Sequence, residues 1–120
     1  RFMAKKRNST DFFRHEDERR IILEWIGNMP FRSAKAVIAK TDEAVGGHYH
    51  NKKDEVFFLL SGRAKRVVVG DVEEFGVVAP KKWFAGKGVH HIFELEKGAI
   101  LLTAATGAFD PEDEIKRVTE

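Results

Sequence analysis

The sequence predicts a single all-β domain built as a small sandwich or barrel, and three observations carry this prediction. Its β-prone runs have the length of strands and not of helices. Most of these runs end at glycine or proline, the residues that most often mark turns. With 120 residues, the chain can bury one hydrophobic core but not two. About seven or eight short strands at close spacing are typical of sandwiches and small barrels.

The amino-acid composition of the N-terminal part of the chain changes near residue 20. Residues 1–20 are polar and rich in charge, so we expect an irregular N-terminal arm with room for one short element. The runs 20–26 (RIILEWI) and 34–40 (AKAVIAK) are the first predicted strands. The sequence Gly-Asn-Met-Pro at 27–30 is a strong turn signal between them. We therefore expect one domain over 1–120, with its barrel over 21–110.

Five further runs are predicted to complete the β domain. The last two are expected to pair across a hairpin turn at 96–98. Half-buried strands favour aromatic residues, so the aromatics of the runs are assigned to the core. These runs are 55–60, 64–69, 75–79, 89–95 and 99–104, and the core aromatics are Trp25, Phe57, Phe58 and Phe93.

Two segments are expected to lie outside the strands. The stretch between Pro80 and Gly88 is interpreted as a loop, with Trp83 and Phe84 lining a pocket mouth or a dimer interface. Residues 111–120 form the tail. In its first part, 111–117, a proline opens the segment and acidic residues precede basic ones, as the helix dipole favours. A short C-terminal helix is therefore predicted.

Composition limits the classes of function. Hydrophobic residues make up 42% and charged residues 33% of the chain, which is an ordinary globular balance. The net charge is only +2, and the basic residues form no dense stripe, which disfavours nucleic acid as a partner. No apolar run approaches the length of a membrane span, and the first residues do not resemble a signal peptide. A cytoplasmic protein with a small-molecule ligand or substrate is expected.

The histidines and one glutamate form the pattern with most chemical content. The chain has no cysteine, so a transition metal would have to be held by imidazole and carboxylate groups. His48 and His50 are two residues apart, and on a strand their side chains face the same side. Glu55 opens the next predicted strand, and antiparallel pairing of the two strands would bring its carboxylate to the same point. Such a face suits divalent Zn, Mn, Fe or Ni and leaves positions open for substrate.

The complete spacing resembles the first motif of the cupin superfamily. It consists of H-x-H at 48–50, four residues, Glu55, six residues and Gly62. One departure is Asp42, which stands where the motif usually has glycine. Pro80 followed by residues 86–91 fits the second motif more loosely. The resemblance implies a small cupin-type β-barrel, or jelly roll, with a divalent metal held by the motif residues.

The second motif implies a fourth metal ligand, for which His90 and His91 are both candidates. The usual Gly-x-x-His interval, counted from Gly88, ends on His91. The phase 91, 93, 95 is also more apolar than 90, 92, 94, as an inward-facing series should be. The expected metal ligands are therefore His48, His50, Glu55 and His91, with His90 as the alternative to His91.

A narrower likeness concerns the substrate. Residues 44–50 and 57–64, and the tail at 107–111, look like cupins of deoxysugar and surface-polysaccharide biosynthesis, the RmlC-like cupins. This resemblance implies an isomerase or epimerase acting on a small polar carbonyl compound such as a nucleotide-linked keto-sugar. A non-catalytic small-molecule-binding module and a metal-dependent dioxygenase are the alternatives. The catalytic base is not identified by the sequence, and a homodimer is expected because cupins commonly pair through sheet edges.

Overall fold

The computed structural model describes residues 10–26 and 29–116 of the chain. In these residues the regular structure is almost entirely β, with one three-residue 3-10 turn at Pro111–Asp113. The strands are β1 (Phe13–Glu16), β2 (Ile21–Glu24), β3 (Ser33–Ile38), β4 (Glu43–Tyr49), β5 (Glu55–Ser61), β6 (Arg63–Val69), β7 (Val72–Val78), β8 (Lys81–Ala85), β9 (His91–Leu95), β10 (Ile100–Ala105) and β11 (Ile115–Lys116).

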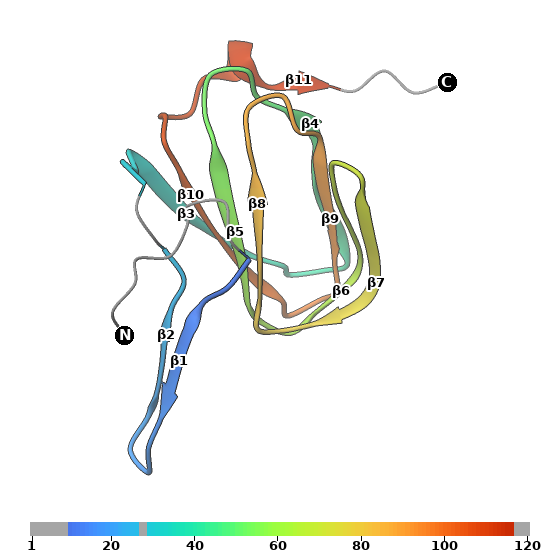
Figure 1. The fold of residues 1–120 in the computed structure, drawn as a ribbon. Helices are drawn as coiled ribbons and strands as arrows, with labels where there is room; N and C mark the ends of the chain where they lie inside the picture. Colours follow the sequence, from blue (N-terminus) through green and yellow to red (C-terminus); the bar gives the residue numbers. More distant parts are fainter. Residues whose placement is uncertain (1–9, 27–28, 117–120) are drawn as a thin grey trace.

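Two antiparallel sheets face each other and form the body of the molecule (Figure 1). One sheet has the order β3-β10-β5-β8, and the other has the order β11-β4-β9-β6-β7. The all-β class predicted from the sequence is confirmed. Within the described part of the chain, no strand pairing joins these two sheets, so the expected barrel takes the form of two facing sheets.

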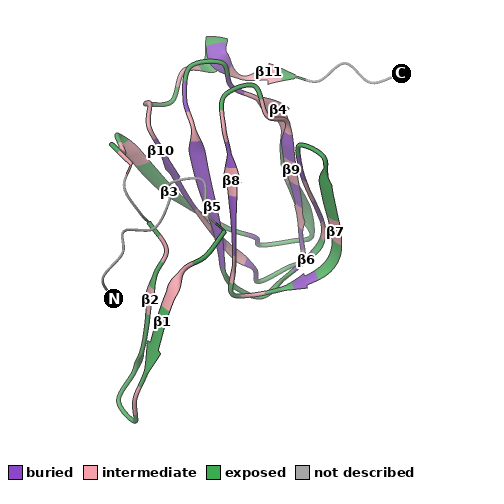
Figure 2. Ribbon diagram, in the orientation of Figure 1, coloured by how far each residue is buried: buried purple, intermediate pink, exposed green. Residues whose placement is uncertain are grey.

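The hydrophobic core fills the space between the sheets, where β5, β8 and β9 are largely buried (Figure 2). Phe57 on β5 packs against Phe93 of β9 in a tilted arrangement with a ring-centroid distance of 4.6 Å, and Trp83 of β8 meets Phe93 edge-on at 5.3 Å. Each large apolar side chain buried in this way stabilises the fold by about 1.5–3 kcal/mol. The core therefore holds together the strands that carry the candidate site.

The N-terminal segment forms a hairpin that projects from the body (Figure 1). β1 pairs with β2 and not with either large sheet, so the expected boundary at residue 20 falls inside this hairpin. At the base of the hairpin, Phe12 and Trp25 pack on Phe58 with ring-centroid distances of 5.0 and 5.5 Å. They cover part of the outer face of the four-stranded sheet. The predicted turn at 27–30 begins with two residues that lie outside the described ones.

The predicted loop after Pro80 is wrong, because residues 81–85 form β8 and pair with β5. Trp83 is 4% exposed and belongs to the core, and its Nε1 donates a hydrogen bond of 2.7 Å to Glu74. The two lysines at the start of this strand conceal its apolar character in the sequence. Pairing with β5 makes it the edge strand of the four-stranded sheet.

The predicted C-terminal helix is also wrong in the described residues. After one 3-10 turn, Ile115 and Lys116 extend and pair with Tyr49 and His48 of β4. Asp110 caps the turn by accepting the N–H of Glu112 at 3.0 Å. A helix this short gains too few hydrogen bonds to offset its nucleation, and the free edge of β4 offers backbone partners instead. In the part of the chain that the structure describes, no helix is long and apolar enough to cross a membrane.

Candidate functional site

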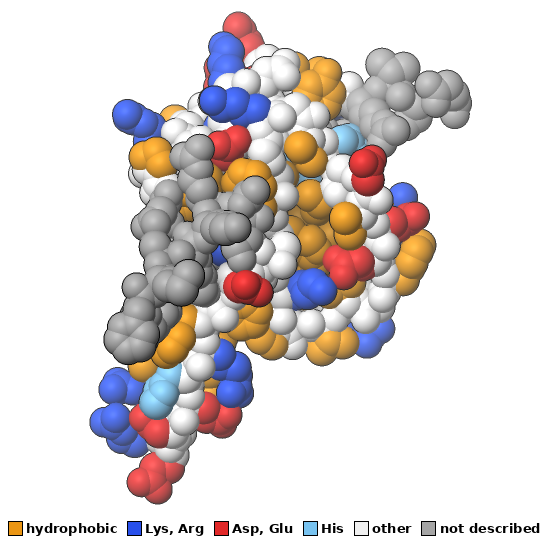
Figure 3. Space-filling model, viewed as in Figure 1, with side chains coloured by type: hydrophobic (Ala, Val, Ile, Leu, Met, Phe, Trp, Pro, Cys, Tyr) orange, Lys and Arg blue, Asp and Glu red, His pale blue; other side chains and the backbone are white. Residues whose placement is uncertain are grey.

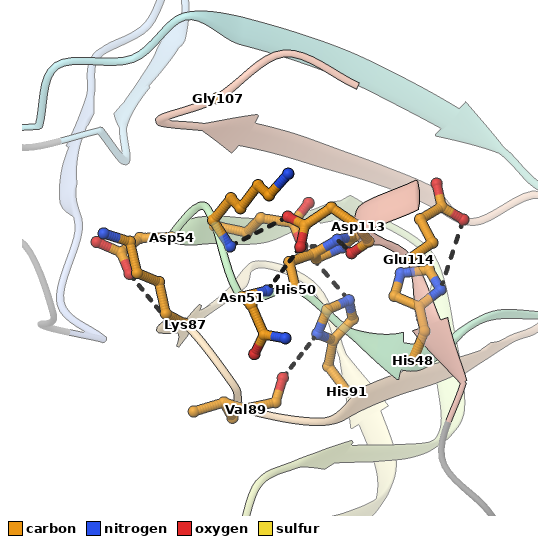
Figure 4. A network of polar contacts seen from close by, with 12 residues as sticks. His48, His50, Asn51, Asp54, Lys87, Val89, His91, Gly107, Asp113 and Glu114 are labelled. Atoms are coloured by element: carbon orange, nitrogen blue, oxygen red, sulfur yellow. Dashed lines mark hydrogen bonds and ion pairs between the residues drawn. The ribbon is translucent and has the colours of Figure 1, made fainter. Parts of the chain in front are cut away.

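Three imidazoles meet at one end of the space between the two sheets (Figure 4). We call this end the mouth and define it by His48, His50, Glu55 and His91. The nitrogen atoms that His48, His50 and His91 can offer to a metal all lie within 4.8 Å of one another. His50 and His91 are buried, whereas the side chain of His48 is 19% exposed. The three histidines that were favoured from the sequence therefore converge.

A β-bulge in β4 brings its end close to β9. The register of the β4–β9 pair shifts between Gly46 and His48, after which His48 is paired with His91. Gly46 has a φ of +99°, and a Cβ placed on it would lie only 2.6 Å from the carbonyl oxygen of His91. Only glycine allows this backbone conformation together with this close approach. The glycines before the H-x-H pattern thus have a structural role in positioning it.

Glu55 reaches the site from the opposite sheet, which corrects the pairing expected from the sequence. β5 pairs with β10 and β8, and β4 pairs with β9 and β11, so the strands of Glu55 and His48 are not neighbours. Glu55 instead faces the histidines across the interior. Its Oε1 lies 3.0 Å from Nε2 of His50 and 3.4 Å from Nε2 of His91.

Backbone carbonyl groups fix the orientation of the two buried imidazoles. Nδ1 of His50 donates to the carbonyl oxygen of Asp113 at 2.8 Å, and Nδ1 of His91 donates to that of Val89 at 3.2 Å. A carbonyl can only accept, so the proton of a neutral ring resides on Nδ1 and the lone pair is on Nε2. Both lone pairs then point toward Glu55 and the centre of the mouth.

Asp113 is a site residue that the sequence reasoning missed. It is 3% exposed, and its carboxylate accepts the N–H groups of Asn51 and Lys52 at 2.9 and 3.1 Å. Together with its carbonyl bond to His50, it holds the segment that follows β4 (Figure 4). Its position in a turn that looked helical in sequence, 63 residues from His50, gave no local signal.

Burial determines the protonation states at the mouth. Removal from water raises the pKa of the Glu55 carboxyl, while nearby His50 and lysine charges act in the opposite direction. Burial lowers the pKa of His48 and brings the pKa of His91 down to about 3. Both rings are therefore neutral near pH 7. Neutral imidazole is the form that accepts a proton or binds a metal.

His90 and His91 are separated by the register of β9. β9 begins at His91, and its burial alternates so that His91, Phe93 and Leu95 face the interior. His90 precedes the strand and is not among the three grouped histidines; its carbonyl oxygen accepts the N–H of Gly70 at 2.8 Å. Tyr49, the last residue of β4, lies between His48 and His50 and pairs with Ile115. The phase argument from the sequence thus selects the histidine that the fold brings to the mouth.

Glu55 also borders a cavity of about 170 Å³. Its polar walls come from β3, β10 and the β4–β5 segment, and include Lys35, Lys53 and Thr103. The cavity gives a small polar molecule a place next to the buried carboxyl group. Sequence reasoning did not single out these residues because they come from three separate segments.

Comparison with known proteins identifies the fold. No family model and no curated protein matches the sequence. Among solved structures, a 3,4-ketoisomerase from Helicobacter canadensis is similar at 19% identity, over 90% of this chain and 88% of that one, with a TM-score of 0.75. A TDP-quinovose 3,4-ketoisomerase from Campylobacter jejuni is similar at 21% identity, over 88% of each chain, with a TM-score of 0.74.

A third solved structure belongs to an epimerase. The dTDP-6-deoxy-D-glucose-3,5-epimerase from Legionella pneumophila, in complex with dTDP-4-keto-L-rhamnose, is 18% identical over 88% of this chain and 69% of that one, with a TM-score of 0.72. At these identities the likeness concerns the fold. The chain therefore has the fold of the RmlC-like cupins, which the dTDP-sugar epimerases and ketoisomerases share.

Proposed function

We propose that this protein is an isomerase or epimerase that moves a proton next to the carbonyl of a nucleotide-linked keto-sugar, in carbohydrate biosynthesis. The observation that carries the proposal is the mouth itself. The neutral imidazoles of His48 and His91 meet the buried Glu55 carboxyl group of raised pKa, and Glu55 borders a cavity. The fold is that of enzymes described as a 3,4-ketoisomerase and a 3,5-epimerase. Groups with such shifted pKa values in a cleft are typical of acid–base sites.

Reactions of this class need a base that removes a proton to form an enediolate and an acid that returns a proton to it. In the protein without a bound metal, His48 is the best candidate for the base, because burial keeps its ring neutral and its lone pair free while its side chain remains 19% exposed to an incoming substrate. Glu55, with its raised pKa, can carry the returning proton, either directly or through His50, whose Nε2 lies 3.0 Å away. Transfer between adjacent carbons would give ketoisomerisation, and return to the same carbon would give epimerisation.

As the alternative to this metal-free acid–base pair, we propose that a divalent metal, Zn, Mn, Fe or Ni, binds at His48, His50, Glu55 and His91. Ligand atoms around one ion at bonds of about 2.1 Å lie about 3.0–3.4 Å apart. The distances from Glu55 Oε1 to the Nε2 atoms of His50 and His91 fall in this range. In the described residues this buried oxygen has no hydrogen-bond partner, as is expected of an atom that binds a cation. Such an ion would polarise the carbonyl and stabilise the enediolate.

An NMR experiment in D₂O tests the reaction. The protein is incubated with a dTDP-linked 4-keto-6-deoxyhexose, and the carbonyl and the deuterium are located in the product. A 3,4-ketoisomerase would move the carbonyl to C3 and place deuterium at C4. An epimerase would leave the carbonyl at C4 and place deuterium at C3 or C5. Saturable binding without either exchange would contradict the enzyme and favour a binding module. Oxygen consumption with bound iron would point to a dioxygenase.

Elemental analysis of protein purified without chelator tests the metal proposal separately. A stoichiometric ion whose removal abolishes turnover, with recovery on adding it back, would support it. Full turnover by protein with no metal would contradict it and would leave His48 and Glu55 as the acid–base pair.

We further propose that the protein is a homodimer. Ile21, Ile22 and Ile26 of the projecting hairpin are 51%, 42% and 38% exposed, and Ile38 on edge strand β3 is 62% exposed. Figure 3 shows apolar and charged side chains mixed along this hairpin. Covering such apolar groups and an open sheet edge favours association. Light scattering over a range of concentrations tests this, and a constant monomer mass would contradict it.

A further inference from the structure

Two turns of the same build flank β9, one at the mouth and one at the far end of the strand (Figure 1). The mouth turn, residues 86–89, joins β8 to β9, and the far turn, residues 96–99, joins β9 to β10. Both have lysine and glycine in the middle, and the N–H of the last residue donates to the carbonyl oxygen of the first at 3.1 and 3.0 Å. The glycines have φ values of +78° and +91°, as the third residue of a type II turn requires.

An aspartate from another part of the chain holds each turn. At the mouth, Oδ1 of Asp54 accepts the N–H of Lys87 at 3.0 Å. At the far end, Oδ1 of Asp42 accepts the N–H of Lys97 at 2.8 Å. In both turns the glycine N–H also donates to a backbone carbonyl, which at the mouth is that of His50. The same set of hydrogen bonds therefore closes the two ends of β9.

The backbone of Asp54 is fixed, so its carboxylate can hold the mouth turn in one position. Its N–H donates to the hydroxyl of Thr106 at 2.9 Å, and its carbonyl oxygen accepts the N–H of Thr106 at 3.0 Å. Thr106 directly follows β10, and Glu55 directly follows Asp54. Asp54 thus connects the end of β10 and the start of β5 with the mouth turn, and Figure 4 shows its carboxylate bonded to Lys87.

The two turns differ in the side chain that follows them. Two residues after Val89 stands His91, whose Nδ1 donates to the carbonyl oxygen of Val89 at 3.2 Å. Two residues after Ala99 stands Leu101, which is fully buried and has no polar group to orient. The mouth turn therefore contains the acceptor that decides which nitrogen of His91 carries the proton, and the far turn has no such task.

We propose that Asp54 is a positioning residue for His91. By holding the mouth turn, its carboxylate keeps the Val89 carbonyl in place, and this carbonyl keeps the proton of the neutral His91 ring on Nδ1. Nε2 then presents its lone pair 3.4 Å from Oε1 of Glu55, where it can accept a proton or bind a cation. The orientation of the ring rests on these contacts alone, whereas its effect on turnover rests on the proposed function.

NMR measures the tautomer of His91 directly. Two-bond ¹H–¹⁵N correlation spectra of the ¹⁵N-labelled full chain, treated with chelator so that no metal occupies Nε2, distinguish the Nδ1–H form from the Nε2–H form. Asp54→Ala removes the acceptor of Lys87 N–H, and the loss of one hydrogen bond should lower the ratio of Nδ1–H to Nε2–H about fivefold. Asp54→Asn keeps an oxygen acceptor and should restore most of the ratio.

The matched control is Asp42→Ala, which opens the far turn in the same way. Asp42 also forms an exposed ion pair with Lys65, whose loss should affect stability little. Urea denaturation should show a modest loss of stability in both variants, but only Asp54→Ala should change the tautomer ratio of His91. If Asp54→Ala keeps the wild-type ratio, or if Asp42→Ala shifts the ratio as much, the proposal is overturned.

A second pair of variants tests the same turn without altering Asp54. Gly88→Ala and Gly98→Ala each place a Cβ where nothing lies within 4 Å, so the positive φ is the source of strain. Gly88→Ala should shift the tautomer of His91, and Gly98→Ala should not. If Asp54→Ala does not fold, which circular dichroism would reveal, this pair decides, and an unchanged ratio in Gly88→Ala overturns the proposal.

The tautomer measurement does not depend on the reaction, so the two proposals can fail separately. A tautomer shift in Asp54→Ala, with no turnover of the keto-sugar by the wild type, would refute the proposed function and support the positioning role. Turnover by the wild type, with an unchanged tautomer in Asp54→Ala, would do the reverse.

Discussion

The mouth and the deeper interior are built on the same strands but from opposite kinds of residue. Glu55 and His91 stand at the mouth, and Phe57 and Phe93 lie one step further in. The Phe57 ring is 4.9 Å from the imidazole of His91, so the two layers touch. The inward-facing positions, from the mouth inward, are Glu55, Phe57 and Leu59 on β5 and His91, Phe93 and Leu95 on β9.

This difference shows that stability and chemistry are separated along the strands. Buried titratable groups are costly to keep without water, and the apolar layer supplies the free energy that offsets this. The Phe57 ring of this layer also contacts His91, and burial keeps the imidazoles of His48 and His91 neutral. Substitutions in the inner layer should therefore affect folding, and those at the mouth should affect function.

The largest effect is expected for Phe93→Ala. Phe93 is 1% exposed and contacts both Phe57 and Trp83, so its removal leaves a cavity and should reduce the free energy of unfolding by about 3–5 kcal/mol. Urea denaturation measures this. The control is Ile92→Ala on the outward-facing side of the same strand, which should lower stability by less. Equal losses of unfolding free energy in the two variants would contradict the distinction between the inward and outward faces of β9.

The next effect concerns the chemistry of the mouth. His48→Ala and His50→Ala should each lower turnover of the keto-sugar by about 10²–10⁴-fold, as expected when a general acid–base group is lost. Both should leave the circular dichroism spectrum unchanged, and both should lose metal, as should Glu55→Ala. His15→Ala in β1, an exposed position outside the mouth, is the control. Full metal retention by the double variant His48→Ala/His50→Ala would rule out the proposed metal site.

A smaller effect, on metal affinity, is expected at the neighbouring residues His90 and His91. His91→Ala should lower metal affinity about tenfold or more, because one of four ligands is lost. His90→Ala should change it little, because His90 is not among the grouped histidines. Equilibrium titration with zinc against a competing chelator measures both. The reverse ranking would mean that β9 is shifted by one residue, through a bulge near Gly88.

The smallest effect is expected for the residue that positions His50. Asp113→Ala removes the carboxylate that accepts Asn51 N–H and Lys52 N–H, and should lower metal affinity or turnover about tenfold without unfolding. Asp113→Asn keeps one oxygen acceptor and should recover part of the loss. A structural role alone would lower stability and leave the KM, the kcat and the metal affinity of the folded protein unchanged.

Much of the fold was predictable because it follows from local patterns. The runs at 55–60 and 64–69 became β5 and β6 within a residue at each end, since both end at glycine. β8 was missed because its lysines interrupt the apolar pattern, and only its pairing with β5 buries Trp83. The C-terminal helix was predicted from the position of proline and the order of charges. In the structure, this segment instead pairs with the edge of β4.

For the site, the sequence by itself determined that His48 and His50 face one way and that His91 shares its face with Phe93. Strand alternation is a property of consecutive residues, so one sequence suffices to establish it. Only the tertiary structure decided that Glu55 approaches from the opposite sheet, that Asp113 orients His50, and that Lys35 and Lys53 line one cavity. Those contacts join segments far apart in the chain, and they depend on which strands pair and how the sheets face each other, which no local pattern specifies.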